Sequence, residues 1–473
     1  MGTLARKSDI GHAYGIIQKP KTSPIPYSVY RASALAQYVA EGAGIGTNRG
    51  LYEILMTVMG GHFRESRGCM FPALIRMGYG PRESRRVYRA AALGAWDCND
   101  LLARVHAYVH AENFWVPLRV AGCRVMSLDT VGFFRPRLKG LVSRHFAPAE
   151  HKTTPAICMG QLAAMGRVGE QPVALPLLIV RGNSNTDTED KLMGELIGQA
   201  GALTKEDWVA CADRKFKSIE MVQGGLTRIV KRVQKNAIFR REAPPEYLGK
   251  GRRSRYGERV RPLARRLKGK LIEATPPDEQ MSWQVEEKGK KITVTASIWR
   301  RLQLYEQRRW SDGTRALSNK TLWTVYAFAH PGFEEPMLVI TNAEFTAPEA
   351  YQIVRGRWGV EQPPLVSKQI LGLHRQNVWS ADMRYRLPEL GFIAAAILTY
   401  IAASSRAIPA GWWDTHAKPT AGRLRWQLSV LRRKDLRRLL RGTKLRVKKS
   451  VTAHLPAGNR YPRRSATSIP LRN

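Results

Sequence analysis

The sequence predicts an α/β protein of several domains, of the α+β type, in which a core of alternating strands and helices is interrupted by a β-rich insertion and flanked by helical regions. The chain has 473 residues, more than one compact core usually holds, and 44% of them are hydrophobic. Apolar residues recur at helical spacing near both ends and at strand spacing through the middle. We divide the chain into residues 1–118, 119–235, 236–341, 342–405 and 406–473.

The charge balance restricts the kind of partner. Lys and Arg number 77 against 38 Asp and Glu, which gives a formal net charge of +39. Such a surplus repels itself in a compact fold unless a polyanion neutralises it, and nucleic acid is the commonest one. An anionic membrane is the main alternative, but the longest apolar run, residues 390–403, is shorter than the roughly 20 residues of a spanning helix. We therefore expect a buried core helix there and no membrane partner.

The cysteines and the N-terminus indicate a cytoplasmic protein. The five cysteines are scattered and form no Cys-x-x-Cys pair, so neither a zinc site nor a disulfide framework is predicted. No apolar signal segment follows the basic residues at the start of the chain, so secretion is not expected.

The first region, residues 1–118, is predicted to be helical. Apolar residues lie three and four positions apart in 29–40, 53–59, 82–92 and 99–110. Four arginines share one face of the third of these helices: Arg82, Arg85, Arg86 and Arg89. We expect a small DNA-binding domain, with a solvated basic helix face as the alternative.

The second region, residues 119–235, is predicted to be a core of strands and helices. Expected strands cover 122–128, 157–165, 173–180, 208–212 and 226–233, with a helix over 187–200 whose first turn is acidic and a short helix after 213. Together with the helix expected after residue 341, this order is that of the ribonuclease H-like fold.

Two acids follow predicted strands of this core. Asp129 comes directly after the strand over 122–128, and Asp213 directly after the strand over 208–212. In a ribonuclease H-like sheet the ends of the first and fourth strands lie side by side, so the two carboxylates can share metal ions. Hard cations such as Mg²⁺ prefer carboxylate oxygens, and a pair of them activates the attacking oxygen and stabilises the leaving one in phosphodiester cleavage. Each acid alone has a simpler reading, as a turn residue or, for Asp213, a helix N-cap.

Residues 236–341 are predicted to be an insertion. Residues 236–275 are very basic and include Arg252, Arg253 and Arg255, and strand composition follows at 282–286, 291–298, 321–329 and 336–341. The last region, 406–473, is basic with helical spacing over 424–440.

A third acid lies in a helical context within residues 342–405. Arg357 and Glu361 are four residues apart and share a helix face, and Lys368 lies about two turns further along. Alone, this pattern indicates a surface ion pair. Pro363 and Pro364 are expected to interrupt or kink the helix between Glu361 and Lys368.

The Arg-x3-Glu-x6-Lys pattern, with the apolar strand over 337–342 before it, resembles the third catalytic motif of bacterial insertion-sequence DDE transposases. The match is to the group with the signature Tyr-x2-Arg-x3-Glu-x6-Lys, although Val354 stands at the tyrosine position and Tyr351 lies one turn earlier. The sequences Ser-Leu-Asp-Thr around Asp129 and Ala-Asp-Arg-Lys-Phe around Asp213 resemble the first two motifs of that family. The resemblance covers about residues 120–402.

The resemblance implies a ribonuclease H-like core with a β-rich insertion, in which Asp129, Asp213 and Glu361 are catalytic and hold two Mg²⁺ or Mn²⁺ ions. It implies that Arg357 and Lys368 bind the DNA end. The expected partners are double-stranded DNA, as terminal inverted repeats and target, and a second copy of the chain in a synaptic dimer. The expected setting is the bacterial cytoplasm, at the nucleoid when DNA is bound.

Further DNA contacts are expected from the insertion. Its basic run, Arg252, Arg253 and Arg255, is similar to an arginine-rich segment of the family. In relatives that form hairpin ends, an aromatic of the insertion stacks on a flipped base. Trp299 is our first candidate for it, ahead of Trp310 and Trp323, with core packing as the alternative for each.

Two other functions remain open at this level. One is a non-catalytic or decayed transposase-derived DNA-binding protein, which Pro363 and Pro364 favour. The other is a nuclease of the same fold that cuts DNA without joining it.

Overall fold

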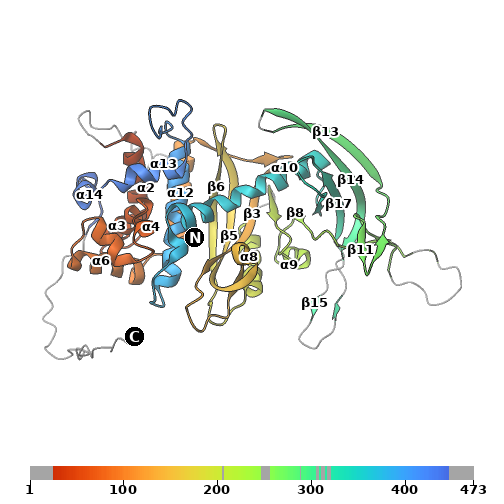
Figure 1. Ribbon diagram of the computed structural model, residues 1–473, viewed down its shortest axis with the longest axis horizontal. Coiled ribbons are helices and arrows are strands. Elements are labelled where there is room, and N and C mark those ends of the chain that lie inside the picture. Colours follow the sequence, from red (N-terminus) through yellow and green to blue (C-terminus); the bar gives the residue numbers. More distant parts are fainter. Residues whose placement is uncertain are drawn as a thin grey trace, which may run out of the picture.

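The protein is a mixed α/β structure in which a body of helices lies at one end and a long mixed sheet extends away from it (Figure 1). The computed structural model describes residues 25–204, 207–244, 246, 256–287, 289–304, 308–309, 315–316 and 321–446. The expectation of a chain that contains both helices and strands in the same fold is confirmed.

Both ends of the described chain contribute to the helical body (Figure 1). Its N-terminal helices are α2 (Tyr27–Ala40), α3 (Asn48–Met59), α4 (His62–Glu65), α5 (Met70–Arg76), α6 (Pro81–Leu93) and α7 (Cys98–Glu112). The long helix α12 (Met383–Ala403) and the C-terminal helices α13 (Ala421–Ser429) and α14 (Arg433–Leu439) complete it. Buried leucines of the last region, Leu424, Leu428, Leu436, Leu440 and Leu445, belong to the same core as α2, α3 and α12.

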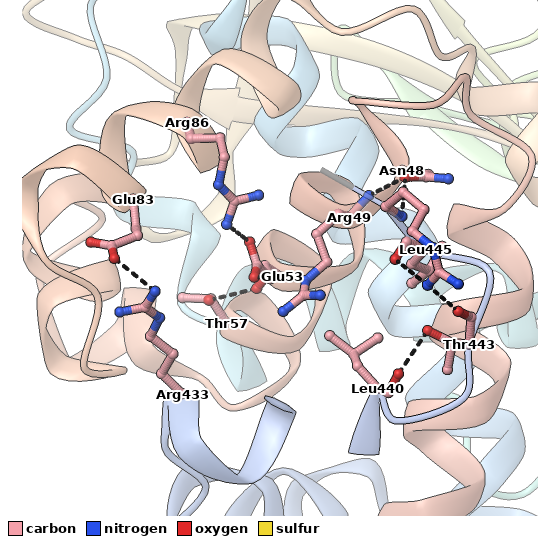
Figure 2. Close-up of polar contacts among 11 residues, drawn as sticks. Asn48, Arg49, Glu53, Thr57, Glu83, Arg86, Arg433, Leu440, Thr443 and Leu445 are labelled. Atoms are coloured by element: carbon pink, nitrogen blue, oxygen red, sulfur yellow. Dashed lines mark hydrogen bonds and ion pairs between the residues drawn. The ribbon is translucent and has the colours of Figure 1, made fainter. Parts of the chain in front are cut away.

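Polar contacts also hold the two ends together (Figure 2). The Arg433 guanidinium of α14 donates to Glu83 of α6 over 2.7 Å. The backbone N–H of Arg446 donates to Asn48 Oδ1 at the start of α3 over 3.3 Å. The C-terminal segment that the structure describes, residues 421–446, is therefore an integral part of the helical body.

Helix α12 confirms the core helix expected over residues 390–403, since all residues of that range except Thr399 and Ala403 are buried. In the described part of the chain it is the one helix long and apolar enough to cross a membrane, and 83% of its most apolar window is buried inside the protein. Burial of this kind is typical of a core helix, so the length of α12 is weak evidence for a membrane span.

Glu389 makes α12 sensitive to pH. It is 7% exposed, and burial raises the pKa of its carboxyl to about 7, although the Arg181 guanidinium 3.3 Å away acts in the opposite direction. Between its ordinary pKa, about 4.3, and the folded value, the folded protein keeps a proton that the unfolded chain has released. The free energy of unfolding therefore falls as the pH rises through this window, by about 3 kcal/mol.

A Glu389→Gln variant should lose that part of the pH dependence. The free energy of unfolding is measured by urea unfolding for the native protein and for the variant. As the pH is raised from about 5 to about 8, the native protein is expected to lose about 3 kcal/mol of stability relative to the variant. Glu170→Gln, at an exposed turn, is the matched control and should leave the difference unchanged. Parallel pH profiles for native protein and Glu389→Gln would contradict the prediction.

The central strands of the sheet are neighbours in the order β6, β5, β3, β7, β8. Their bounds are β3 (Cys123–Phe134), β5 (Lys152–Val168), β6 (Gln171–Arg181), β7 (Trp208–Ala212) and β8 (Ile229–Arg232). β5 is antiparallel to β3 and β6, whereas β7 is parallel to both β3 and β8. The first and fourth of these strands are thus adjacent and run in the same direction.

The strands of residues 236–341 extend this sheet. β18 (Met337–Thr341) pairs antiparallel with β8, and β17 (Leu322–Ala329), β14 (Lys290–Leu304), β9 (Phe239–Arg241) and β10 (Arg259–Val260) follow in that order. β13 (Glu279–Glu287) forms a long hairpin with β14, visible at the far end in Figure 1. Smaller strands are β1 (Trp115–Pro117), β2 (Arg119–Val120), β4 (Arg144–Ala147), β11 (Arg265–Leu267), β12 (Lys270–Ile272), β15 (Arg308–Arg309) and β16 (Arg315–Ala316).

Helices cover both faces of the central strands. Leu128 and Leu162 pack in the core beneath α8 (Glu189–Leu203) and α9 (Ser218–Gln223). Val131 and Met159 lie on the opposite face, in the core shared with α12, and α10 (Ala347–Arg357) covers β7 and β8 on that face. Because side chains alternate along a strand, Asp129 faces the same side as Val131, towards α10 and α12.

Candidate active site

Asp129 and Asp213 lie at neighbouring positions of two adjacent parallel segments. Leu128 of β3 is paired with Ala212, the last residue of β7, and the residue that follows each of them is an acid. Neighbouring strands are about 5 Å apart, which brings the two backbones close together at this point.

The strand end predicted at Asp129 was wrong. β3 continues to Phe134, so Asp129 lies within the strand, whereas Asp213 directly follows the last residue of β7 as expected. The reason is that Val131 and Phe133 are buried and the segment remains paired with β5 as far as Phe134 and Ala156. Asp129 is the first residue of β3 beyond its pairing with β7, which ends at Leu128 and Ala212.

Glu361 is carried by a helical segment that changes its winding. α10 begins with a capping box between Thr346 and Glu349 and ends at Arg357. A 3-10 turn (Trp358–Glu361), a short helix α11 (Gln362–Leu365) and a π-helical turn (Val366–Ile370) follow directly. Pro363 and Pro364 interrupt the regular α-helix as expected, but they stand in the first turn of α11, where a missing N–H costs little. The chain stays helical through them.

The three acids interact through Asp129. Burial raises the pKa of the Asp129 carboxyl to about 6; the Arg357 guanidinium and the N–H of Thr130 act against this, and the charges of Glu361 and Asp213 add to it. Asp213 Oδ1 is buried and has no hydrogen-bond partner among the described residues. The site thus combines a desolvated carboxylate, Asp129, with a buried oxygen of Asp213 that has no hydrogen-bond partner in the described part of the chain.

Arg357 is a buried cation beside these acids. It is 3% exposed, and one of its terminal nitrogens donates to Glu361 Oε1 over 3.3 Å, while the Glu361 side chain is 55% exposed. Its Nε is buried without a hydrogen-bond partner in the described part of the chain. The alternative of a simple surface ion pair therefore does not describe this contact.

Lys368 reaches the same strand from the π-helical turn. Its Nζ donates to the Gly132 carbonyl of β3 over 3.0 Å and lies 5.2 Å from the ring centre of Phe134. Burial lowers the pKa of its ammonium group, and the negative charge of Asp129 acts in the opposite direction. Arg357, at the end of α10, and Lys368, in the π-helical turn, thus both act on the charge of Asp129.

A second polar cluster lies on the other face of β3, beneath the start of α8. The Glu189 carboxylate accepts hydrogen bonds from Thr130 Oγ1 at 2.5 Å, His145 Nδ1 at 2.9 Å and Lys215 Nζ at 3.2 Å. Burial alone would raise the Glu189 pKa, but these donors lower it to about 2. The cluster connects the residue after Asp129 with the loop after Asp213, so it holds the two acid-bearing segments together.

Glu189 was missed at the sequence level. Its signal was the acidic first turn predicted for this helix, but Asp187 and Asp190 share that signal. Asp187 caps the preceding turn through the N–H of Asn183, so only the fold distinguishes the three acids.

The tryptophans proposed to stack on DNA are buried. Trp299 of β14 is 1% exposed and its Nε1 donates to the Pro276 carbonyl over 2.9 Å, and Trp323 is fully buried. The proposal for Trp299 is therefore corrected, because its side chain faces the sheet core although two arginines follow it. Trp310, Arg252, Arg253 and Arg255 lie outside the described residues.

The ligand type of the three acids suits a hard divalent cation, but their side chains are not yet arranged around one point. Carboxylate oxygens are the ligands such ions prefer, and Asp213 Oδ1 is available for one. No group of three or more His, Cys, Asp or Glu side chains in the described ranges is close enough to hold a metal as it stands. Glu361 is half exposed and accepts a hydrogen bond from Arg357.

No model of a known protein family matches this chain, and no curated protein sequence matches it. A functional assignment therefore depends on the residues of the site and on the fold that positions them.

Proposed function

We propose that the protein is a DDE transposase, which cuts DNA strands with divalent metal ions and transfers the freed ends to a target. The observation that carries this proposal is the pair of acids at neighbouring positions of two parallel strands, with a third acid and a buried arginine opposite them. Asp129, Asp213 and Glu361 are the proposed metal ligands.

The strand order supports a ribonuclease H-like core. Numbered along the chain, β3, β5, β6, β7 and β8 are the first to fifth strands, and their order in the sheet is third, second, first, fourth, fifth. The ribonuclease H-like reading of the sequence requires the first and fourth strands to be adjacent and parallel, as β3 and β7 are. The β-rich segment between β8 and α10 agrees with the insertion expected for this family.

The chain's own residues have defined tasks in this proposal. Bound metal ions supply an activated water and stabilise the leaving oxygen. Arg357 and Lys368 place two cations beside the acids, where they can hold the phosphate being cut. The Glu189 cluster fixes the backbone on either side, so that Asp129 and Asp213 keep their spacing.

The test is an assay of cleavage and joining. The full-length protein is incubated with Mg²⁺ and a DNA fragment carrying the inverted repeats found at the borders of its own gene, together with a supercoiled target plasmid. We expect nicks at the repeat ends and covalently joined products, both abolished by EDTA.

The same assay separates the alternatives. Cleavage without joined products would indicate a nuclease of this fold. Specific binding of the repeats without cleavage in Mg²⁺ or Mn²⁺ would indicate a non-catalytic DNA-binding relative, a reading that the absence of a preformed three-acid cluster among the described residues keeps open.

A further inference from the structure

A basic cavity lies beyond the candidate active site, between the loop after β6 and the start of α12. Its volume is about 440 Å³, and its walls include Arg181, Arg384, Arg386 and the ring of Tyr385. Asp382, which is exposed, also lines it. The mechanism proposed above makes no use of these residues.

The arginines around this cavity have few direct ion-pair partners, although the charges of Asp382 and Asp97 also act on Arg386. Arg181 pairs with Glu389 over 3.3 Å, and within the described residues Glu389 is the one acid in ion-pair contact with this group. Arg386 donates to the neutral Gly94 carbonyl over 2.7 Å. Buried Arg135, at the end of β3, adds a further cation, and its pKa is lowered by burial and by repulsion from Arg384. An anion in the cavity would relieve this repulsion.

Arg384 is the cation best placed to receive that anion. Its guanidinium lies 5.1 Å from the ring centre of Tyr385, which Arg181 also approaches, at 5.7 Å. Arg384 Nε is buried, and no hydrogen-bond partner for it exists among the described residues. A planar guanidinium held against a ring presents its N–H groups in a fixed direction, which suits the oxygens of a phosphate.

The sheet register places this cavity near the proposed cutting site. Val131 of β3 pairs with Met159 of β5, and Met159 pairs with Arg181 of β6, so the three residues form one row. Asp129 is two residues before Val131 and faces the same side of the sheet. Two strand spacings across and two residues along give about 12 Å between the backbones of Asp129 and Arg181. At about 3.4 Å per base pair, this is the length of three to four base pairs.

We propose that this cavity binds a backbone phosphate of the same DNA whose strand is cut at Asp129, with Arg384 as the principal contact. The inference rests on the proposed function for the source of the phosphate. A free phosphate compound is the other source with the same chemistry, and the experiment distinguishes the two.

The experiment measures DNA affinity against salt concentration for the full-length protein by fluorescence anisotropy. Arg384→Gln is expected to weaken binding to any duplex about tenfold at moderate salt and to reduce the slope of log affinity against log salt by about one. Arg384→Lys keeps the charge and should retain the slope, while it loses part of the affinity. Arg167→Gln is the matched control, since Arg167 is exposed at the opposite end of the β5–β6 hairpin, and it should behave as the native protein.

The outcomes separate this inference from the proposed function. If native protein binds DNA and Arg384→Gln has the same salt slope, the DNA phosphate proposal is overturned. It is also overturned if inorganic phosphate, titrated by calorimetry, binds native protein but not Arg384→Gln while both bind DNA alike. If the native protein binds no DNA at all, the proposed function is contradicted, and the DNA phosphate proposal falls with it. The thermal unfolding midpoints of Arg384→Gln and Arg384→Lys are compared as a folding control. Equal midpoints show that a loss of DNA binding by Arg384→Gln is not caused by unfolding.

Discussion

Replacing Asp129 by alanine is expected to abolish metal-dependent DNA cleavage, with a rate loss of at least about a thousandfold. A missing metal ligand removes several kcal/mol of transition-state stabilisation, and about 4 kcal/mol already corresponds to a factor of a thousand. The measurement is the amount of nicked and joined DNA formed in Mg²⁺ at equal enzyme concentration. DNA binding should persist, because Asp129 is an acid and contributes no attraction for phosphate.

The loss can be separated from misfolding. Burial raises the Asp129 pKa to about 6, so the charged carboxylate is unfavourable in the folded protein at neutral pH. Asp129→Asn, which removes the charge at constant size, is therefore expected to be at least as stable as the native protein and equally inactive.

The control for the Asp129 variants is another acid on the same sheet. Asp207 precedes β7, is partly exposed and pairs with Arg124 over 3.0 Å, so Asp207→Ala should cleave at the native rate. Native-level cleavage by Asp129→Ala would remove this residue from the site.

The strands that carry the acids could be predicted because their signals are local. The buried run before Asp213 forms a strand with the predicted bounds, Trp208–Ala212. The segment around Asp129 was predicted too short, because Asp129 and Thr130 are polar and suggest a turn. In the fold, Thr130 is satisfied by Glu189, a partner 59 residues away that no local pattern identifies.

The orientation of single aromatics could not be predicted. Trp299 is followed by two arginines and is therefore a reasonable candidate for a DNA contact by composition. Which face of β14 it takes depends on the register with β17, where an irregularity separates Trp299 from Leu302. A shift of one residue would move the side chain to the other face, so register decides between core and surface.

Local sequence patterns also could not predict that the N-terminal and C-terminal helices pack together. The periodicity over 424–440 predicts helical structure, but not the surface on which it packs. Contacts between residues hundreds of positions apart, such as Arg433 with Glu83, exist only in the folded chain (Figure 2).

The second large effect is expected in this helical body. Glu53 of α3 is 3% exposed, and its carboxylate accepts from Arg49 over 3.1 Å and from Arg86 of α6 (Figure 2). Glu53→Ala leaves two partly buried guanidinium groups without their counter-charge and opens space between the two helices. We expect the free energy of unfolding to fall by about 3 kcal/mol, the lower part of the range for a broken buried ion pair, because both arginines keep some contact with water.

Urea unfolding followed by circular dichroism measures this loss, and the neighbouring Glu83→Ala is the matched control. Glu83 pairs with Arg433 on the surface of the same body, where solvent screens the charges, so its removal should change the unfolding free energy far less. Equal losses for Glu53→Ala and Glu83→Ala would mean that burial of Glu53 does not set the strength of its contacts. A large loss for Glu53→Ala alone would identify the α3–α6 pairing as the contact on which the helical body depends, and with it the packing of the C-terminal segment.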